Sequence, residues 1–359
     1  MKSNSPPRRF PELCVSGTPY EIGRQIGEGA REQIRGFCAM ALERVNKTVA
    51  VSRSSAYRVA SDSMAWVERY APDQLEELRG MASAAGVTLD DILLLQIRNQ
   101  LQPDDAGGCT SLSLAPLSLA TRSTVGRIVA QNWDNDPALD PFTLVLTRRP
   151  TGKPAFTTIT QAGLIAYIGF NEAGMGLCLN TLPAPSRKLG VPHYCIVRRL
   201  LETRSLAEAI ETVSRAERAI PANIMLSTPE GPADLEATLE GVHVLRDATQ
   251  VLHTNHCLHP ELAAVNRQFP ELIQSRPRLA RMEALLRGVG SNPTLEEIAG
   301  VLRDHDGYPA SICRHANADP RHGFWQTVFS VIIQPESQQM HATRGTPCDR
   351  PYETYRAPR

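Results

Sequence analysis

The first hundred residues place apolar side chains in the rhythm of an α-helix. Ile22, Ile26, Ala30 and Ile34 recur every four positions, with polar residues between them. This spacing puts the four side chains on one face of a helix. The pattern therefore predicts a largely helical segment over residues 19–101, whose apolar faces pack on a shared core.

Local signals also mark where one helix ends and the next begins. Gly86 fits a helix stop, because glycine readily adopts the left-handed conformation of a C-terminal cap. Thr88 fits the N-cap of a further helix, and Asp91 stands at the third helical position of a capping box. We expect this helix to carry Ile92 and Leu95 on its buried side.

The pattern changes after residues 102–108, a polar loop rich in Pro, Asp and Gly. Alternation with period two then dominates, with turn signals at 149–154 and 171–174. Helical spacing returns at 190–218 and 276–303. The predicted strands are 109–115, 126–133, 142–149, 155–161, 164–170, 175–180, 223–227, 234–240, 242–246, 249–255, 309–314 and 325–333. Strand runs interrupted by helices predict two sheets with helices packed outside them.

Composition narrows the range of functions. The 38 basic and 38 acidic residues among 359 give no net charge, so nucleic acid is not an expected partner. No apolar run suggests a secretory signal or a membrane span. The eight cysteines are scattered without a Cys-x-x-Cys pair. We therefore expect reduced thiols in a cytoplasmic protein that has no membrane partner.

The junction of Gly108 and Cys109 is the strongest chemical signal in the chain. It lies where the polar loop, ending in Gly107, enters a predicted strand. The Cys109 thiol can attack the carbonyl of Gly108, which has no side chain to obstruct it, and cleavage would give segments 1–108 and 109–359. A freed Cys109 would carry its own base, because an α-amine titrates at about 7.7–8.0 and a thiol at about 8.5. The alternative is a turn followed by a buried structural cysteine.

Six further sequence blocks resemble the acyl-coenzyme A:6-aminopenicillanic acid (isopenicillin N) acyltransferase family, in the family's order and at similar spacing. They are LCVSGTPYEIGRQIG (13–27), GCTSL (108–112), QNWD (131–134), GFNEAGMGLCLN (169–180), HTNHCL (253–258) and GYPASICR (307–314). The resemblance implies the α+β fold of self-cleaving N-terminal-nucleophile (Ntn) hydrolases, a four-layer αββα sandwich. It also implies that residues 1–108 become a helical small subunit and residues 109–359 a catalytic large subunit. The two would stay together as a heterodimer within one structural domain.

The same resemblance implies a compact acyl-transfer site. Cys109 is the expected nucleophile, and Asp134 is the carboxylate that orients or ionises its α-amine. Asn255 is the expected side-chain donor to the oxyanion, and Arg314 the fixed positive charge beside the thiolate. Gly108 and Cys109 form the expected cleavage site. Two further residues are expected to support the site, Gln131 and His256.

Three positions depart from the family pattern. Gly107 stands where a relative has an acidic residue, and Gln96 and Gln100 replace the ends of an Asn-x-Arg-x-Glu run. These changes bear on cleavage efficiency, on the acyl pocket and on whether penicillins are substrates. The expected reaction is acyl transfer from acyl-CoA or an N-acyl amide to an amino-acid-like or peptide-like amine. Amide hydrolysis with release of the acid, and a non-cleaving relative without activity, are the alternatives.

Two other constellations are weaker. His253, His256, Cys257 and His259 are dense enough to suggest a metal site, but His253 and His256 would point to opposite faces of a strand. Cys313 and His315 flank Arg314 like a protease dyad, yet side chains of neighbouring strand residues point apart. We therefore expect no metal and no organic cofactor, with a coenzyme A thioester serving only as substrate.

Overall fold

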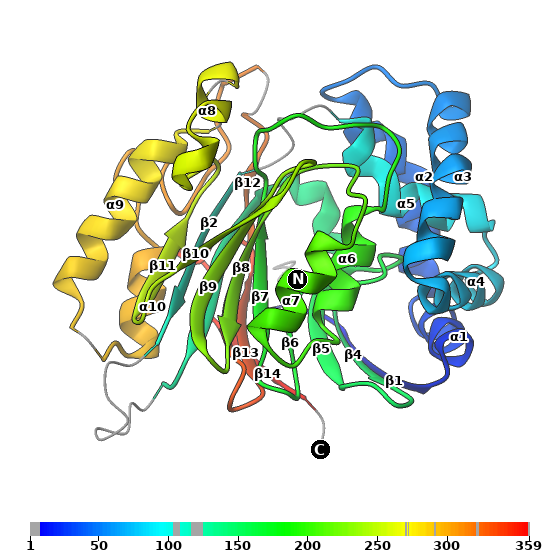
Figure 1. Cartoon of the computed structure of the whole chain (residues 1–359), viewed down its shortest axis with the longest axis horizontal. Coiled ribbons are helices and arrows are strands. Elements are labelled where there is room, and N and C mark those ends of the chain that lie inside the picture. Colours follow the sequence, from blue (N-terminus) through cyan, green and yellow to red (C-terminus); the bar gives the residue numbers. More distant parts are fainter. Residues whose placement is uncertain are drawn as a thin grey trace, which may run out of the picture.

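Two β-sheets lie face to face, and helices cover the outer side of each, as Figure 1 shows. The computed structural model describes residues 8–102, 108–115, 125–269, 271, 273–290, 292–320 and 323–357. Contacts of β2 with β7 and β8, and of β3 with β7, join the inner faces of the sheets. The predicted α+β, four-layer αββα architecture is confirmed. The loop residues 103–107, including Gly107, lie outside the described residues.

The larger sheet has eight strands in the order β1-β4-β5-β6-β7-β8-β9-β10. They are β1 (Glu12–Gly17), β4 (Thr143–Pro150), β5 (Phe156–Gln161), β6 (Ile168–Asn171), β7 (Gly176–Asn180), β8 (Ala222–Thr228), β9 (Gly231–Ala237) and β10 (Val242–Arg246). All neighbours are antiparallel except β1, which pairs in parallel with β4. The N-terminal segment therefore supplies an edge strand to the sheet of the C-terminal segment.

The smaller sheet has six antiparallel strands in the order β11-β2-β3-β12-β13-β14. They are β11 (Gln250–His253), β2 (Gly108–Leu114), β3 (Ile128–Asn135), β12 (Gln326–Gln334), β13 (Gln339–Arg344) and β14 (Glu353–Arg356). The register of β2 against β3 pairs Gly108 with Asp134 and Cys109 with Trp133. Neighbouring strands thus place the predicted cleavage site beside the predicted carboxylate.

Ten α-helices and two short 3₁₀ helices fall within the described residues. The α-helices are α1 (Pro19–Gly29), α2 (Arg31–Asn46), α3 (Arg53–Tyr70), α4 (Pro72–Ala85), α5 (Leu89–Leu101), α6 (His193–Leu200), α7 (Leu206–Ser214), α8 (Val265–Gln268), α9 (Ser275–Gly288) and α10 (Leu295–Leu302), and the 3₁₀ helices are η1 (Pro137–Phe142) and η2 (Pro260–Leu262). Gly86 caps α4 at φ +71°, and Thr88 and Asp91 form a capping box on α5, as predicted. No described helix has the length and apolarity required to cross a bilayer.

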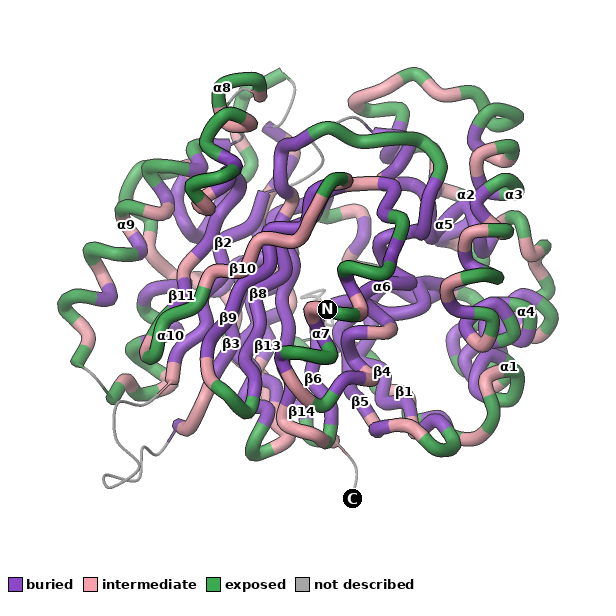
Figure 2. Tube along the Cα trace, in the orientation of Figure 1, coloured by how far each residue is buried: buried purple, intermediate pink, exposed green. Residues whose placement is uncertain are grey.

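Two apolar clusters hold the layers together. The main cluster joins α1, α2, α4 and α5 to both sheets, with Ile34, Leu95 and Ile159 almost fully buried. A second cluster packs α9 and α10 against the outer face of the smaller sheet through residues such as Met282 and Ile298. Figure 2 shows the central strands of the sheets buried, whereas the edge strand β10 is partly exposed and the helices expose their outer faces.

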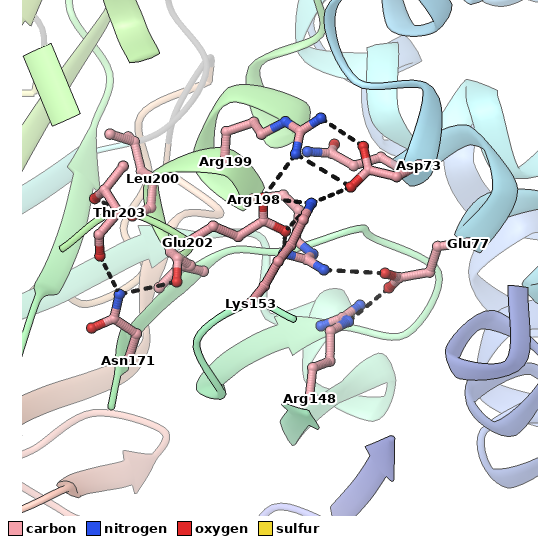
Figure 3. Close-up of polar contacts among 12 residues, drawn as sticks. Asp73, Glu77, Arg148, Lys153, Asn171, Arg198, Arg199, Leu200, Glu202 and Thr203 are labelled. Carbon is pink, nitrogen blue, oxygen red and sulfur yellow. Dashed lines mark hydrogen bonds and ion pairs between the residues drawn. The ribbon is translucent and has the colours of Figure 1, made fainter. Parts of the chain in front are cut away.

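A buried ion network fastens helix α4 to the C-terminal segment (Figure 3). Glu77 lies 2.7 Å from Arg148 Nε on β4 and 3.5 Å from Arg198 Nη2 on α6. All three side chains are at most 3% exposed. Nearby, Asp73 of α4 pairs with Arg199 at 2.6 Å. Opposite charges from the two predicted subunits therefore meet in the protein interior.

One strand prediction was wrong, and three strands were not predicted. Residues 309–314 form turns and bends, because Cys313 and His315 donate their backbone N–H groups to nearby carbonyls at Asp304 and Pro309. Ile312 is buried in the apolar cluster between the smaller sheet and helices α9 and α10, without pairing with a strand. The three strands that were not predicted are β1, β13 and β14.

Candidate active site

Cys109 is the second residue of β2 and lies at the wall of a pocket between the sheets and the N-terminal helices. Its side chain is only 3% exposed. Its backbone N–H donates to Asn255 Oδ1 at 3.0 Å. Burial and the nearby Asp134 carboxylate raise the pKa of the thiol, whereas Arg278 lowers it. In the uncut chain, the group is therefore a neutral thiol.

The pocket beside Cys109 is small, with a cavity volume of about 60 Å³, and has an uncharged lining. Aromatic and aliphatic side chains form much of its wall, and Asn99, Gln102, Asn135 and Asn180 add amides. His193 also lines it, and burial lowers the pKa of this imidazole to about 4, so the ring is neutral at pH 7. Among the described lining residues, none is Asp, Glu, Lys or Arg. Such a wall suits an uncharged acyl group.

Asp134 lies on β3, next to the Gly108–Cys109 bond. A Cβ placed on Gly108 would lie 3.3 Å from Asp134 Oδ2. Thr327 donates its hydroxyl to Asp134 Oδ1 at 2.7 Å, while the buried Oδ2 has no hydrogen-bond partner among the described residues. Burial raises the pKa of this carboxyl group to about 6, against the opposing charges of Arg278 and Arg314. A carboxyl group with this pKa can take and return a proton near neutral pH.

Arg278 is a site residue that the sequence did not reveal. It lies on α9, is 2% exposed, and donates from Nη1 to the Cys109 carbonyl at 2.6 Å and to Thr110 Oγ1 at 2.7 Å. Its Nη2 donates to Asn255 Oδ1 at 2.7 Å. Burial lowers the pKa of the guanidinium to about 10, so it stays charged at neutral pH. One cation thus holds the start of β2 and the Asn255 side chain together.

Asn255 forms a direct hydrogen bond with Cys109. Its Oδ1 accepts from Cys109 and Arg278, and its Nδ2 donates to the Thr181 carbonyl at 3.0 Å. Because both partners of Oδ1 are donors, the orientation of the amide is fixed. In this uncut chain the amide oxygen, and not the NH₂ group, faces Cys109. Its service as an oxyanion donor stays a prediction.

Arg314 stands on the other side of Asp134. Its charge favours the ionised carboxylate, and its Nη1 donates to Gln274 Oε1 at 3.3 Å. Its backbone N–H donates to Thr327 Oγ1 at 3.0 Å. Thr327 in turn donates to Asp134, so Arg314 acts on the carboxylate through charge and through this hydroxyl.

The two expected supporting residues, Gln131 and His256, contact neighbours of the site and not Cys109 itself. Gln131 Nε2 donates to Asn180 Oδ1 at 2.8 Å, which joins β3 of one sheet to β7 of the other. His256 Nδ1 lies 2.7 Å from Ser275 Oγ, which accepts from the Asn255 backbone N–H at 2.8 Å. Burial lowers the pKa of His256 to about 4, so the ring is neutral at pH 7.

The histidine-rich segment around His253 does not converge on one point. His253 lies with Asp234 and Glu236, and its Nε2 is 2.8 Å from Glu236 Oε1. His259 lies elsewhere, with His243 and Glu261.

Cys313 and His315, in contrast, do come together. The segment is not a strand, and Cys313 Sγ lies 3.7 Å from His315 Nε2. The expectation that these side chains point apart was therefore wrong. The pair lies beside His305 and Cys348, away from the lining of the Cys109 pocket.

Comparisons with known proteins identify relatives of this chain. The chain is 28% identical to the acyl-coenzyme A:6-aminopenicillanic-acid-acyltransferase 40 kDa form of Emericella nidulans, over 96% of this chain and 94% of the relative. Among solved structures, it is similar to a conjugated bile acid hydrolase mutant from Clostridium perfringens, with a TM-score of 0.44 and 12% identity over 70% of this chain and 97% of the other. A penicillin V acylase from Agrobacterium tumefaciens gives a TM-score of 0.42 and 13% identity, over 65% and 82% of the two chains.

The family model of the acyl-coenzyme A:6-aminopenicillanic acid acyl-transferases matches residues 121–349. This stretch begins after Cys109 and contains Asp134, Asn255 and Arg314. With most of its length matched, the chain belongs to the acyl-coenzyme A:6-aminopenicillanic acid acyl-transferase family.

Proposed function

We propose that this protein cuts itself between Gly108 and Cys109 and then transfers acyl groups through a thioester on Cys109. The observation that carries the proposal is the position of Cys109. Cys109 lines a buried pocket, and beside the preceding residue lies Asp134 Oδ2, which has no hydrogen-bond partner among the described residues.

The self-cleavage begins with attack of Cys109 Sγ on the Gly108 carbonyl carbon. The new S–C bond forms as the C–N bond breaks, and the thiol proton passes to the leaving nitrogen. Asp134 relays this proton, because its pKa of about 6 suits both uptake and return near pH 7. Water then hydrolyses the thioester and leaves a Gly108 carboxylate, a free thiol and a free α-amine.

The new α-amine takes the place of the present Cys109 amide nitrogen. Asn255 Oδ1, which accepts from that nitrogen at 3.0 Å, then orients the amine. The amine becomes the base for the thiol when the enzyme attacks a substrate. Backbone N–H groups and the second N–H of Asn255 Nδ2, whose first donates to the Thr181 carbonyl, stabilise the oxyanion, and one such donor contributes about 3–4 kcal/mol.

The two chains remain together after the cut as a heterodimer. Strand β1 pairs with β4, and the N-terminal helices share the main apolar core with both sheets. Glu77 adds a buried link to Arg148 and Arg198. Release of the small chain would expose this apolar surface and these charges to water, which is unfavourable.

The donor is an acyl-CoA or an N-acyl amide whose acyl part enters the uncharged pocket. The name of the Emericella nidulans relative points to acyl-CoA as donor and a β-lactam amine as acceptor. We extend the donor class to this chain, with an amino-acid-like or peptide-like amine as acceptor. Acyl-CoA consumption that depends on an added amine supports transfer, and release of free acid without an amine assigns hydrolysis.

The decisive experiment compares wild-type protein with Cys109→Ala by intact mass and N-terminal sequencing. We expect wild type to yield a second chain that begins Cys-Thr-Ser-Leu, and the variant to stay whole. Cys257→Ala, which removes another buried thiol, should still be cut. A wild-type protein that remains one chain after prolonged incubation would overturn the proposal.

A further inference from the structure

Four potential metal ligands converge beside Arg314, on the outer side of the smaller sheet. They are His305, Cys313, His315 and Cys348, and their ligand atoms all lie within 4.8 Å of one another. His305 follows α10, Cys313 and His315 flank Arg314, and Cys348 comes from the turn after β13. The cluster shares no residue with the lining of the Cys109 pocket.

The spacing of these atoms is that of a tetrahedral site. His315 Nε2 lies 3.0 Å from His305 Nε2, 3.7 Å from Cys313 Sγ and 3.5 Å from Cys348 Sγ. A tetrahedral Zn²⁺ with Zn–S of about 2.3 Å and Zn–N of about 2.0–2.1 Å places S and N ligands about 3.6 Å apart and two N ligands about 3.3 Å apart. The three distances therefore need only small adjustments to enclose an ion.

The donor set also matches zinc in chemistry and charge. Two thiolates and two neutral imidazoles form a Cys₂His₂ set, which is a closed structural site without a free coordination position. On binding, each thiol gives its proton to solvent, and the two thiolates neutralise the charge of the cation. Cys313 is fully buried, whereas His305 is exposed and leaves a route of entry from water.

We propose that His305, Cys313, His315 and Cys348 bind one structural Zn²⁺ ion. The ion joins the segment that follows α10 to the turn between β13 and β14, two parts of the chain without a shared strand pairing. It also fixes both neighbours of Arg314, whose backbone N–H donates to Thr327 Oγ1. The ion would thus hold the charged side of the active site in place without touching a substrate.

Metal uptake by the full-length protein tests the proposal. Protein purified without a metal column and reduced with a phosphine is titrated with Zn²⁺ and with Co²⁺. We expect one equivalent of zinc by elemental analysis. We also expect the thiolate-to-Co²⁺ charge-transfer bands and the intense d–d absorption of tetrahedral cobalt. The readout is independent of activity and of self-cleavage, so failure of the proposed function would leave this result unaffected.

Two variants distinguish zinc binding at this cluster from nonspecific zinc binding by other thiols. Cys348→Ser removes one ligand but leaves both neighbours of Arg314 intact, and its affinity for zinc should fall by more than the roughly 100-fold that loss of an outer-shell partner costs. Cys14→Ser removes an exposed thiol outside the cluster and should bind zinc like wild type. Prior reduction ensures that a Cys313–Cys348 disulfide cannot mask the site. Reduced wild type that takes up no stoichiometric zinc, or that binds no more tightly than Cys348→Ser, would overturn the proposal.

Discussion

Arg278 Nη1 lies 2.6 Å from the carbonyl oxygen of Cys109, and its Nη2 lies 2.7 Å from Asn255 Oδ1. A single guanidinium from α9 therefore fixes the proposed nucleophile and its amide neighbour at once. Its positive charge also lowers the pKa of the Cys109 thiol and of Asp134. A planar fork with several donors can make these contacts together, which an ammonium group cannot.

Replacement of Arg278 by Lys should slow self-cleavage while retaining the charge. The lysine cannot hold Cys109 and Asn255 simultaneously, and misplacement of a reacting group by about 1 Å can cost on the order of 100-fold in rate. The time course of large-chain formation after cell-free synthesis measures this effect. Arg276→Lys, an exposed position in the first turn of the same helix, should be cut like wild type. Equal rates for Arg278→Lys and Arg276→Lys would contradict this role.

Replacement of Gly108 by a residue with a larger side chain should also slow self-cleavage. A Cβ at this position would lie 2.9 Å from Ile273 Cδ1 and 3.3 Å from Asp134 Oδ2, so either the Ile273 side chain or the peptide must shift. Gly108→Val should be cut more slowly than Gly108→Ala, because its branched side chain demands more room. Gly300→Ala on α10 has no atom within 4 Å of the added carbon and serves as control. Mass spectrometry measures the cleavage rate. A wild-type rate for Gly108→Val would contradict the close approach of Gly108 to Ile273 and Asp134.

Self-cleavage should depend on pH through Asp134. The ionised carboxylate is the relay base, and its pKa is about 6, so the rate should rise with pH to about 6 and then level off. Below that value, it should fall about tenfold per pH unit. Precursor from cell-free synthesis, exchanged into buffers between pH 5 and 8, gives this profile. A rate independent of pH over this range would exclude Asp134 as the base.

The raised pKa of Asp134 also affects stability. The cleavage rate should rise with pH, whereas this contribution to stability falls with pH. The folded pKa of Asp134 lies above its ordinary value of 3.8, so the folded protein holds the proton more tightly than the unfolded chain. This contribution is fully present below pH 3.8 and is lost as the pH rises through about 6. In the uncut Cys109→Ala background, Asp134→Asn should reduce the fall in unfolding free energy across this window. Urea titrations at each pH measure the difference, and identical pH profiles would refute the assignment.

The sheet framework of the site was predictable because alternation along a strand is local information. Antiparallel pairing of β2 with β3 then places Gly108 opposite Asp134, and the family motifs mark both residues. Strand β1 was harder to predict, because it is a short edge strand that leads directly into a helix.

Arg278 and the four-residue cluster depend on tertiary packing. An arginine in an amphipathic helix normally faces water, and nothing in the pattern of α9 shows that this one is buried. The ligands His305, Cys313, His315 and Cys348 come from separate segments and lack the paired spacing of a zinc finger. The turns at 309–314 resembled a strand because Ile312 and Cys313 are apolar. Ile312 instead belongs to the apolar cluster between the smaller sheet and helices α9 and α10, and it pairs with no strand.

A smaller pocket beside Cys109 should alter substrate choice without affecting self-cleavage. Ala222, the first residue of β8, lines the pocket, so Ala222→Phe fills space that an acyl group would occupy. We expect normal self-cleavage and a preference for shorter acyl donors, read as kcat/KM for a series of acyl-CoAs. Each excluded methylene should change the discrimination by about 1–3 kcal/mol. An unchanged chain-length profile would show that the acyl group binds elsewhere.

The buried link between α4 and the C-terminal segment should dominate the stability of the assembly. Glu77→Gln leaves Arg148 and Arg198 without their shared carboxylate, and rupture of such a buried pair costs about 3–5 kcal/mol. The neighbouring Glu76 pairs with Arg79 at the surface, where both side chains are nearly half exposed, so Glu76→Gln should cost at most about 1 kcal/mol. Urea unfolding in the uncut Cys109→Ala background compares the two variants within a single chain. In the cleaved protein, Glu77→Gln should also release the small chain at lower urea concentrations in size-exclusion chromatography. Equal effects of the two variants would show that the network is not what holds α4 to the sheet.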